Sequence, residues 1–168
     1  MYKNLLGFVA AFSLILMVSV ASAQQGTWVY SVKFVCGAAQ TDAREIPIVE
    51  PDFYATEIDI HNYRPEAVEI RKQVLFLVQD NEAIGREPNF VEVGGQDGIA
   101  LPPNTAMMDD CVRIREIAGV DTSNLTIGFL VLQNTSEINV DAVYTTTGGE
   151  AGQFPPSIEV ERVEGNRL

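Results

Sequence analysis

The sequence predicts an all-β domain, built as a single antiparallel two-sheet sandwich of immunoglobulin-like type with seven to eight strands. Apolar and polar residues alternate along several short segments, which is the pattern of half-buried strands. Turn-forming residues separate these segments, and no helical pattern of about 10–15 residues lies between them, as an α/β sheet would require. An immunoglobulin-like sandwich fits this pattern best, and a closed barrel is the alternative.

Residues 1–23 have the composition of a cleaved signal peptide. Lys3 lies in a short polar start, residues 5–20 are almost entirely apolar, and Ala21-Ser22-Ala23 supplies the small residues that signal peptidase recognises. A retained membrane anchor is the alternative, because about 17 apolar residues approach the length of a span. No cationic cluster follows, so we expect cleavage before Gln24 and export to the periplasm or the extracellular space.

Cleavage would leave 145 of the 168 residues, with all 23 acidic side chains and ten of the eleven Lys and Arg, for a net charge of −13. Such a charge opposes binding to nucleic acid or anionic lipid, whose affinity depends on Lys and Arg contacts with phosphate. With 46% apolar residues the chain is too hydrophobic for intrinsic disorder. We expect one sandwich domain over residues 24–163 and a loose C-terminal tail over 164–168.

The first half of the domain contains three predicted strands. Residues 27–36 place Trp28, Tyr30, Val32, Phe34 and Cys36 on one face. Alternation returns over residues 53–62, and residues 67–78 form a long strand that ends in an apolar run. The turn-like residues 63–66, which include Pro65, predict that these last two strands pair as a hairpin.

The second half begins with an irregular region. Residues 79–103 are rich in Gly and Pro and predict connections around one or two short strands, such as residues 90–93. Residues 104–112 predict a strand, and 113–118 a brief helical turn before Gly119. The remaining predicted strands are 125–133, which is apolar on both faces and therefore central to its sheet, 138–145, and 157–163 after a Gly/Pro loop at 146–156.

Cys36 and Cys111, the two cysteines of the chain, lie 75 positions apart. In an oxidising compartment a lone pair most simply forms one disulfide. A redox or metal-binding thiol pair is the alternative, but neither cysteine lies in a Cys-x-x-Cys motif and the chain has one His. We therefore predict a structural disulfide.

No catalytic constellation is visible. His61 is the single histidine, and no serine of the mature chain lies in a Gly-x-Ser-x-Gly motif. The glycines over 94–98 lack the Lys-Ser/Thr that a phosphate loop requires, so they predict a turn. We expect a protein that is not an enzyme and has no cofactor.

Glu57, Asp59 and His61 are the most suggestive set of side chains. On a strand they share one face, and a divalent metal would need only a further ligand from a facing strand. The favoured alternative is a solvated outer face opposite Ile58 and Ile60. Its charge partners would come from the predicted hairpin neighbour, namely Glu69, Arg71 and Lys72.

Other chemically suggestive residues have simpler interpretations. Asp109, Asp110, Asp121 and Asn124 suggest calcium but lack the regular spacing of a calcium loop, so an acidic loop is predicted. Glu159 and Glu161 share a strand face at a spacing that glycosidase carboxylates also show, which strand alternation explains without catalysis. Successive strand residues point to opposite faces, so Met107 and Met108 are packing residues rather than a soft-metal site. Asn124 and Asn134 begin glycosylation triplets, which matter only in an organism with that machinery.

The segments 30–37, 54–62 and 142–144 (Tyr-Ser-Val-Lys-Phe-Val-Cys-Gly, Tyr-Ala-Thr-Glu-Ile-Asp-Ile-His-Asn and Ala-Val-Tyr) resemble small exported bacterial β-sandwich proteins of uncharacterised function. The resemblance covers most of the mature chain and implies an all-β exported domain, with no catalytic residue to carry over. We therefore expect a domain that acts by binding or structural association with a protein or surface component, through a strand edge or the loops at one end. The alternatives are a subunit of a cell-surface or envelope assembly, and a metal-binding protein or small metal-dependent enzyme using Glu57, Asp59 and His61.

Overall fold

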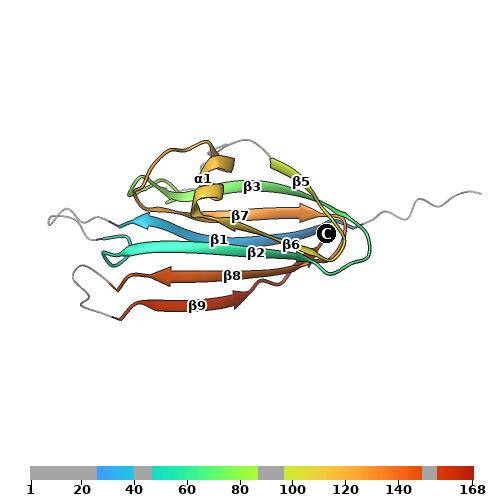
Figure 1. The fold of residues 1–168 in the computed structure, drawn as a ribbon. Helices are drawn as coiled ribbons and strands as arrows, with labels where there is room; N and C mark the ends of the chain where they lie inside the picture. The colour runs from blue at the N-terminus through green and yellow to red at the C-terminus, as the bar shows by residue number, and fades with distance from the viewer. Residues whose placement is uncertain (1–25, 40–46, 87–96, 149–154) are drawn as a thin grey trace, which may run out of the picture.

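The structure is a computed structural model that describes residues 26–39, 47–86, 97–148 and 155–168 (Figure 1). These ranges contain ten strands and one helix, so the all-β prediction is confirmed. The predicted signal peptide, the predicted strand at 90–93 and most of the glycine turn at 94–98 lie outside the described residues. The strands are β1 (Trp28–Ala38), β2 (Phe53–Asn62), β3 (Val68–Gln79), β4 (Glu82–Ala83), β5 (Asp97–Leu101), β6 (Thr105–Asp110), β7 (Thr126–Asn134), β8 (Asn139–Thr146), β9 (Ser157–Arg162) and β10 (Asn166–Arg167), and the helix is α1 (Cys111–Ala118).

All ten strands belong to one open antiparallel sheet. Its main order is β4-β3-β7-β1-β2-β8-β9, and β5, β6 and β10 pair with β3, β2 and β1 respectively. β1 pairs with β7 from Trp28 to Cys36, and with β2 only at Gly37 and Ala38. β1 therefore links two groups of strands, one centred on β7 and the other on β2. In Figure 1, β9 is the outermost strand at the lower side and α1 lies over the face of the sheet.

The alternating pattern of β1 is confirmed by burial. Tyr30, Val32, Phe34 and Cys36 are at most 1% exposed, and their neighbours Ser31 and Lys33 are exposed. They belong to one apolar cluster that also takes residues from β2, β3, β7, β8 and α1. The Tyr30 hydroxyl donates to the Ile138 carbonyl at 2.9 Å and accepts from the Ile138 amide at 3.0 Å, so the polar end of this buried ring is satisfied.

The predicted hairpin of residues 53–62 with 67–78 is wrong. β2 pairs with β6 and β8, and β3 pairs with β7, β5 and β4. The buried Asn62 amide donates to the carbonyls of Glu66, Leu101 and Pro102 at 2.8–3.0 Å, and its Oδ1 accepts from the Arg64 amide. These bonds hold the 63–67 segment as a crossing from one group of strands to the other rather than as a hairpin turn.

A β-bulge at Leu77 changes which face the end of β3 presents. Phe76 pairs with Gly128 and Val78 pairs with Ile127, so Leu77 is the extra residue. Val78 consequently packs with Ile127 and Leu125 in a second small cluster, apart from the main core. A side chain at Gly128 would overlap the Leu75 carbonyl oxygen, so this close approach of β3 to β7 requires glycine.

The region after β3, predicted as irregular, opens with a tight hairpin. Asp80 and Asn81 have φ values of 55° and 66°, and Gln79 pairs with Glu82 across the turn. Two consecutive residues with positive φ are the signature of a type I′ turn, which Asp and Asn tolerate well.

The helical turn is confirmed and is slightly longer than predicted. Asp110 caps the N-terminus of α1 by accepting a hydrogen bond from the Arg113 amide at 2.8 Å. Gly119, with φ 68°, ends the helix in the left-handed conformation. Within the described residues no helix has the length and apolarity needed to cross a membrane.

The C-terminal tail is not loose as predicted. Asn166 and Arg167 form β10, which pairs with Trp28 and Val29 of β1, and the Leu168 amide donates to the Thr27 carbonyl at 2.8 Å. β10 could not be predicted from the sequence, because two residues are too few to show an alternating pattern.

Candidate functional site

The disulfide predicted between Cys36 and Cys111 is present, with a Cα–Cα distance of 5.6 Å. It ties the buried face of β1 to the junction of β6 and α1. The Thr56 amide of β2 lies 3.2 Å from Cys111 Sγ, and the Thr56 hydroxyl donates to the Val35 carbonyl at 2.9 Å. Three separate segments therefore meet at this bridge.

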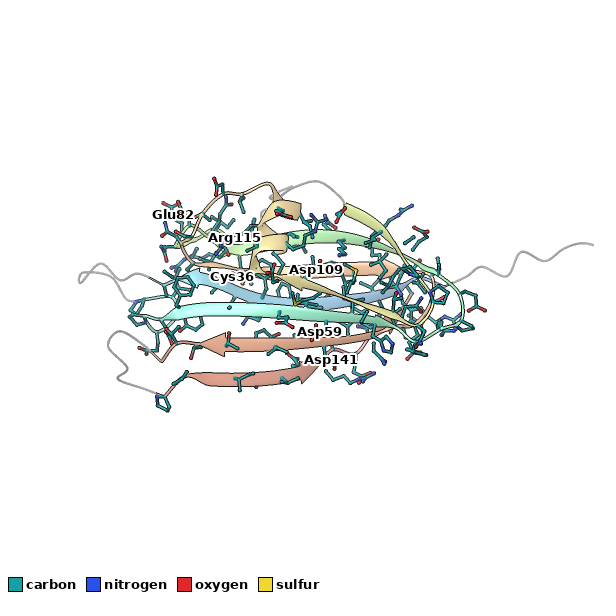
Figure 2. All side chains as sticks on the ribbon, in the orientation of Figure 1. Cys36, Asp59, Glu82, Asp109, Arg115 and Asp141 are labelled. Carbon is teal, nitrogen blue, oxygen red and sulfur yellow. A yellow bond between two sulfur atoms is a disulfide. The ribbon has the colours of Figure 1, made fainter. Side chains whose placement is uncertain are left out.

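A buried ion pair lies two residues before the second cysteine. Lys72 of β3 and Asp109 of β6 are 1% and 0% exposed, and Lys72 Nζ lies 2.8 Å from Asp109 Oδ1 and 2.7 Å from Oδ2. Figure 2 labels Asp109 and Cys36, which both lie in the interior of the fold. Complete burial of both an ammonium and a carboxylate is unusual, because each loses its hydration.

Strand alternation explains why Lys72 points inward. Val68, Ile70, Val74 and Phe76 occupy the same face of β3 and are all buried, so Lys72 is the single charged member of an apolar row. The prediction that Lys72 lies on the outer face with Arg71 is therefore wrong. The sequence does contain a signal for the buried position of Lys72, because this lysine stands where the alternating pattern of the strand calls for an apolar residue.

The hydrogen bonding of this ion pair is incomplete. Among the described residues, the only other partner of Lys72 Nζ is the Met107 thioether at 3.7 Å, a weak acceptor. Asp109 Oδ2 has no hydrogen-bond partner within the described part of the chain, because its contact with Nζ lacks hydrogen-bond geometry. An ammonium and a carboxylate thus face each other at a buried position, with few other polar groups among the described residues to compensate their charges.

Glu57, Asp59 and His61 share one face of β2 as predicted, opposite the buried Ile58 and Ile60. The prediction that residues of β3 are their charge partners is wrong, because β3 does not pair with β2. No group of three or more His, Cys, Asp and Glu side chains suited to a metal occurs in the described ranges.

The actual neighbours of Asp59 form a row across four strands. Asp59 lies opposite Met108 of β6 on one side and Asp141 of β8 on the other, and Asp141 lies opposite Arg162 of β9. Figure 2 labels Asp59 and Asp141 on these neighbouring strands. The row therefore places two carboxylates side by side, which repel each other, and one cation, Arg162, beside the second carboxylate.

The residues that suggested a calcium site have separate structural roles. Asp109 pairs with Lys72, and Asp110 caps α1. The Asn124 side chain donates to Asp80 Oδ1 at 2.7 Å, and the Thr122 hydroxyl donates to the same oxygen at 2.8 Å. These two hydrogen bonds hold the pKa of the Asp80 carboxyl below its ordinary value.

Met107 and Met108 lie as strand alternation predicts, and the two glycosylation triplets differ in accessibility. Met108 is 50% exposed and Met107 is partly buried against the core, so their side chains point to opposite faces. Of the two glycosylation triplets, Asn134 is only 3% exposed, and its side chain donates to the Ser136 carbonyl. A sugar acceptor must reach solvent, so Asn124 is the more accessible of the two.

β9 is the longest described strand in which every residue is exposed. All six of its residues are exposed, with Ile158 at 71% and Val160 at 66%. One edge pairs with β8 along its whole length, and no described strand pairs with the other edge. The register places Val160 beside Val143 on one face, and Glu159 and Glu161 beside Tyr144 and Ala142 on the opposite face.

Glu161 has a structural contact that the sequence did not reveal. The Tyr144 hydroxyl lies 3.1 Å from Glu161 Oε2 and 3.1 Å from the Lys33 carbonyl. The pKa of the Tyr144 phenol is raised, mainly because the phenol is buried and secondly because it interacts with Glu161. Glu159 and Glu161 do lie on one strand face as predicted, and this geometry gives Glu161 a role in holding β9 against β8 and β1.

The chain matches no protein-family model, no curated protein and no solved structure.

Proposed function

We propose that the mature protein is an exported, non-enzymatic domain that associates with a partner through the free edge of β9. The mode is strand addition, in which an extended segment of the partner forms backbone hydrogen bonds with an unpaired strand. The observation that carries the proposal is that one edge of β9 pairs with no other described strand, while Ile158 and Val160 of the same strand are 71% and 66% exposed.

Packing supports an immunoglobulin-like two-sheet sandwich as the scaffold for this edge. The strands around β7 and those around β2 contribute to the same buried cluster, and Tyr30 of β1 bonds Ile138 just before β8. In such a sandwich the two groups of strands would face each other across a shared core, with β9 at the rim of one sheet.

Export is supported by the Cys36–Cys111 disulfide, since such bonds persist in oxidising compartments. The signal-like segment over residues 1–23 supports it from the sequence.

Natural proteins usually protect exposed sheet edges with charges, proline or short length. β9 carries Glu159 and Glu161 on one face, and the other face offers Ile158 and Val160, with Val160 next to Val143 and with Arg162 at the end of the strand beside Asp141. An extended segment that alternates apolar and cationic residues would match both faces, since its cations would lie beside the glutamates.

Charge also indicates that the partner is not a second copy of this chain. Two mature copies would each carry −13, and antiparallel pairing centred on Val160 would place Glu159 of one opposite Glu161 of the other. We therefore assign the edge to a basic extended segment of another protein. A cell-surface or envelope assembly in which a different subunit supplies that strand is one setting for this contact.

The test uses a fluorescent synthetic peptide of about six residues that alternates valine and lysine, titrated against the mature protein. The combined variant Glu159→Lys and Val160→Lys should weaken binding by about tenfold, because each strand pair contributes up to about 1 kcal/mol. Val112→Lys is the matched control: Val112 is 60% exposed but lies on α1, so binding should not change.

Equal affinity of all three proteins, or no binding by the wild type, would contradict the proposal. Light scattering provides a second readout on the same samples. A reversible self-association that the double variant abolishes would show instead that the edge pairs with a second copy.

A further inference from the structure

We propose that Lys72 and Asp109 condense to an amide, which covalently joins β3 to β6 in the mature protein. The inference goes beyond the proposed function, because it concerns a modification within the core and does not depend on β9. It rests on the placement, burial and hydrogen bonding of the two side chains.

The two groups are already placed for the reaction. Lys72 Nζ lies 2.8 Å and 2.7 Å from the two oxygens of Asp109. A nitrogen at these distances from both oxygens is within about 3–3.5 Å of the carbon between them, which is the separation of a near-attack arrangement. Because β3 and β6 are both fixed in the sheet, the effective concentration of the amine at the carboxyl group is very high.

The charges of Lys72 and Asp109 receive little compensation from other described groups. Both side chains are at most 1% exposed, and among the described residues the other hydrogen-bond partner of Lys72 Nζ is the Met107 thioether at 3.7 Å. A buried ion pair is stable only when additional hydrogen bonds satisfy its remaining donors and lone pairs. Within the described residues Asp109 Oδ2 has no such partner, so the charged pair is held without that compensation.

The condensation needs no oxidant, reductant or co-reactant. The step begins with transfer of one proton from the Lys72 ammonium to the Asp109 carboxylate, which gives a neutral amine and a carboxylic acid. The amine lone pair of Lys72 forms a bond with Cγ of Asp109, and the bond from Cγ to one oxygen breaks. That oxygen leaves as water with two protons, one from its own hydroxyl and one from the nitrogen, which leaves one N–H and one carbonyl.

The product would form a second crosslink close to the disulfide. Asp109 lies two residues before Cys111, so β3, β6 and β1 would be joined by covalent bonds at neighbouring points. Such a core would resist unfolding even after the disulfide is reduced, because a chain that contains a crosslink gains less entropy on unfolding.

Intact mass measured on denatured, fully reduced mature protein tests the proposal. The expected mass is that of the sequence less one water molecule. Protease mapping should give a branched peptide that contains Lys72 and Asp109 and survives reduction. Mapping also separates this loss from any cyclisation of Gln24, which removes ammonia at the N-terminus.

Lys72→Arg is the matched control, because arginine keeps the cation beside Asp109 but does not form the amide under these conditions. Its mass should equal that of its sequence, without loss of water. A wild-type mass equal to the unmodified sequence, with Lys72 and Asp109 in separate peptides, would overturn the proposal. That measurement does not require any variant to fold.

Discussion

Lys72 and Asp109 are separated by 37 residues in the chain, yet their charged groups are in direct contact and almost fully buried. Neither side chain could occupy this position alone without leaving a charged group in an apolar interior. The pair therefore determines how β3 and β6 align across the core.

Removal of either partner should be strongly destabilising. Lys72→Met or Asp109→Leu leaves one buried charge without its partner and also prevents the proposed amide, so each should lower the free energy of unfolding by at least about 3–5 kcal/mol. The double variant should lose less than either single variant, because it buries no charge. Urea unfolding curves of the four proteins measure this, and losses that simply add would contradict the interpretation.

The disulfide should make a comparable contribution. Cys36→Ala with Cys111→Ala, or reduction, should lower the free energy of unfolding by about 4–5 kcal/mol, because a closed loop of this length restricts the unfolded chain. Unfolding curves with and without reductant provide the measurement. Alkylation of either cysteine in the native protein under non-reducing conditions would show that the bond is absent in solution.

Gly128 should be intolerant of any side chain. Alanine there would overlap the Leu75 carbonyl oxygen beside the bulge of β3, so Gly128→Ala should cost more than about 2 kcal/mol. Gly98→Ala is the control, since nothing lies within 4 Å of its added carbon. Thermal unfolding of both variants checks this, and equal midpoints would indicate that β3 and β7 do not approach closely there.

Asp80 should contribute to loss of stability in acid. The hydrogen bonds from Asn124 and Thr122 lower its folded pKa, so its contribution is present above the unfolded pKa and is lost as pH falls through the folded value. Asp80→Asn should therefore reduce the difference in stability between about pH 6 and about pH 2. Identical pH profiles for the variant and the wild type would argue against these bonds in solution.

Much of the strand pattern could be predicted from the sequence because a buried face requires alternation. The row from Tyr30 to Cys36 and the outward position of Glu57, Asp59 and His61 follow from that rule. The disulfide followed from composition and expected compartment, since two cysteines allow only one internal pairing.

Pairing between strands could not be predicted in the same way. Pro65 gives a turn signal whether the chain forms a hairpin or crosses between groups of strands, and the Asn62 contacts that select the crossing involve Leu101 and Pro102. Because residues 53–62 and 67–78 are expected to pair as a hairpin, Lys72 is assigned to the outer face as a charge partner, which is the wrong face. Asp109 could not be identified as its partner, because nothing local connects two residues so far apart in the chain.

The central claim, that the free edge of β9 is the contact surface, is tested most directly by amide hydrogen exchange. Ser157–Arg162 should exchange rapidly at the amides that face the unpaired edge, and should gain protection when the alternating valine–lysine peptide is added. The amides of α1 should be unaffected. Protection that appears elsewhere while exchange in β9 stays unchanged would contradict the claim.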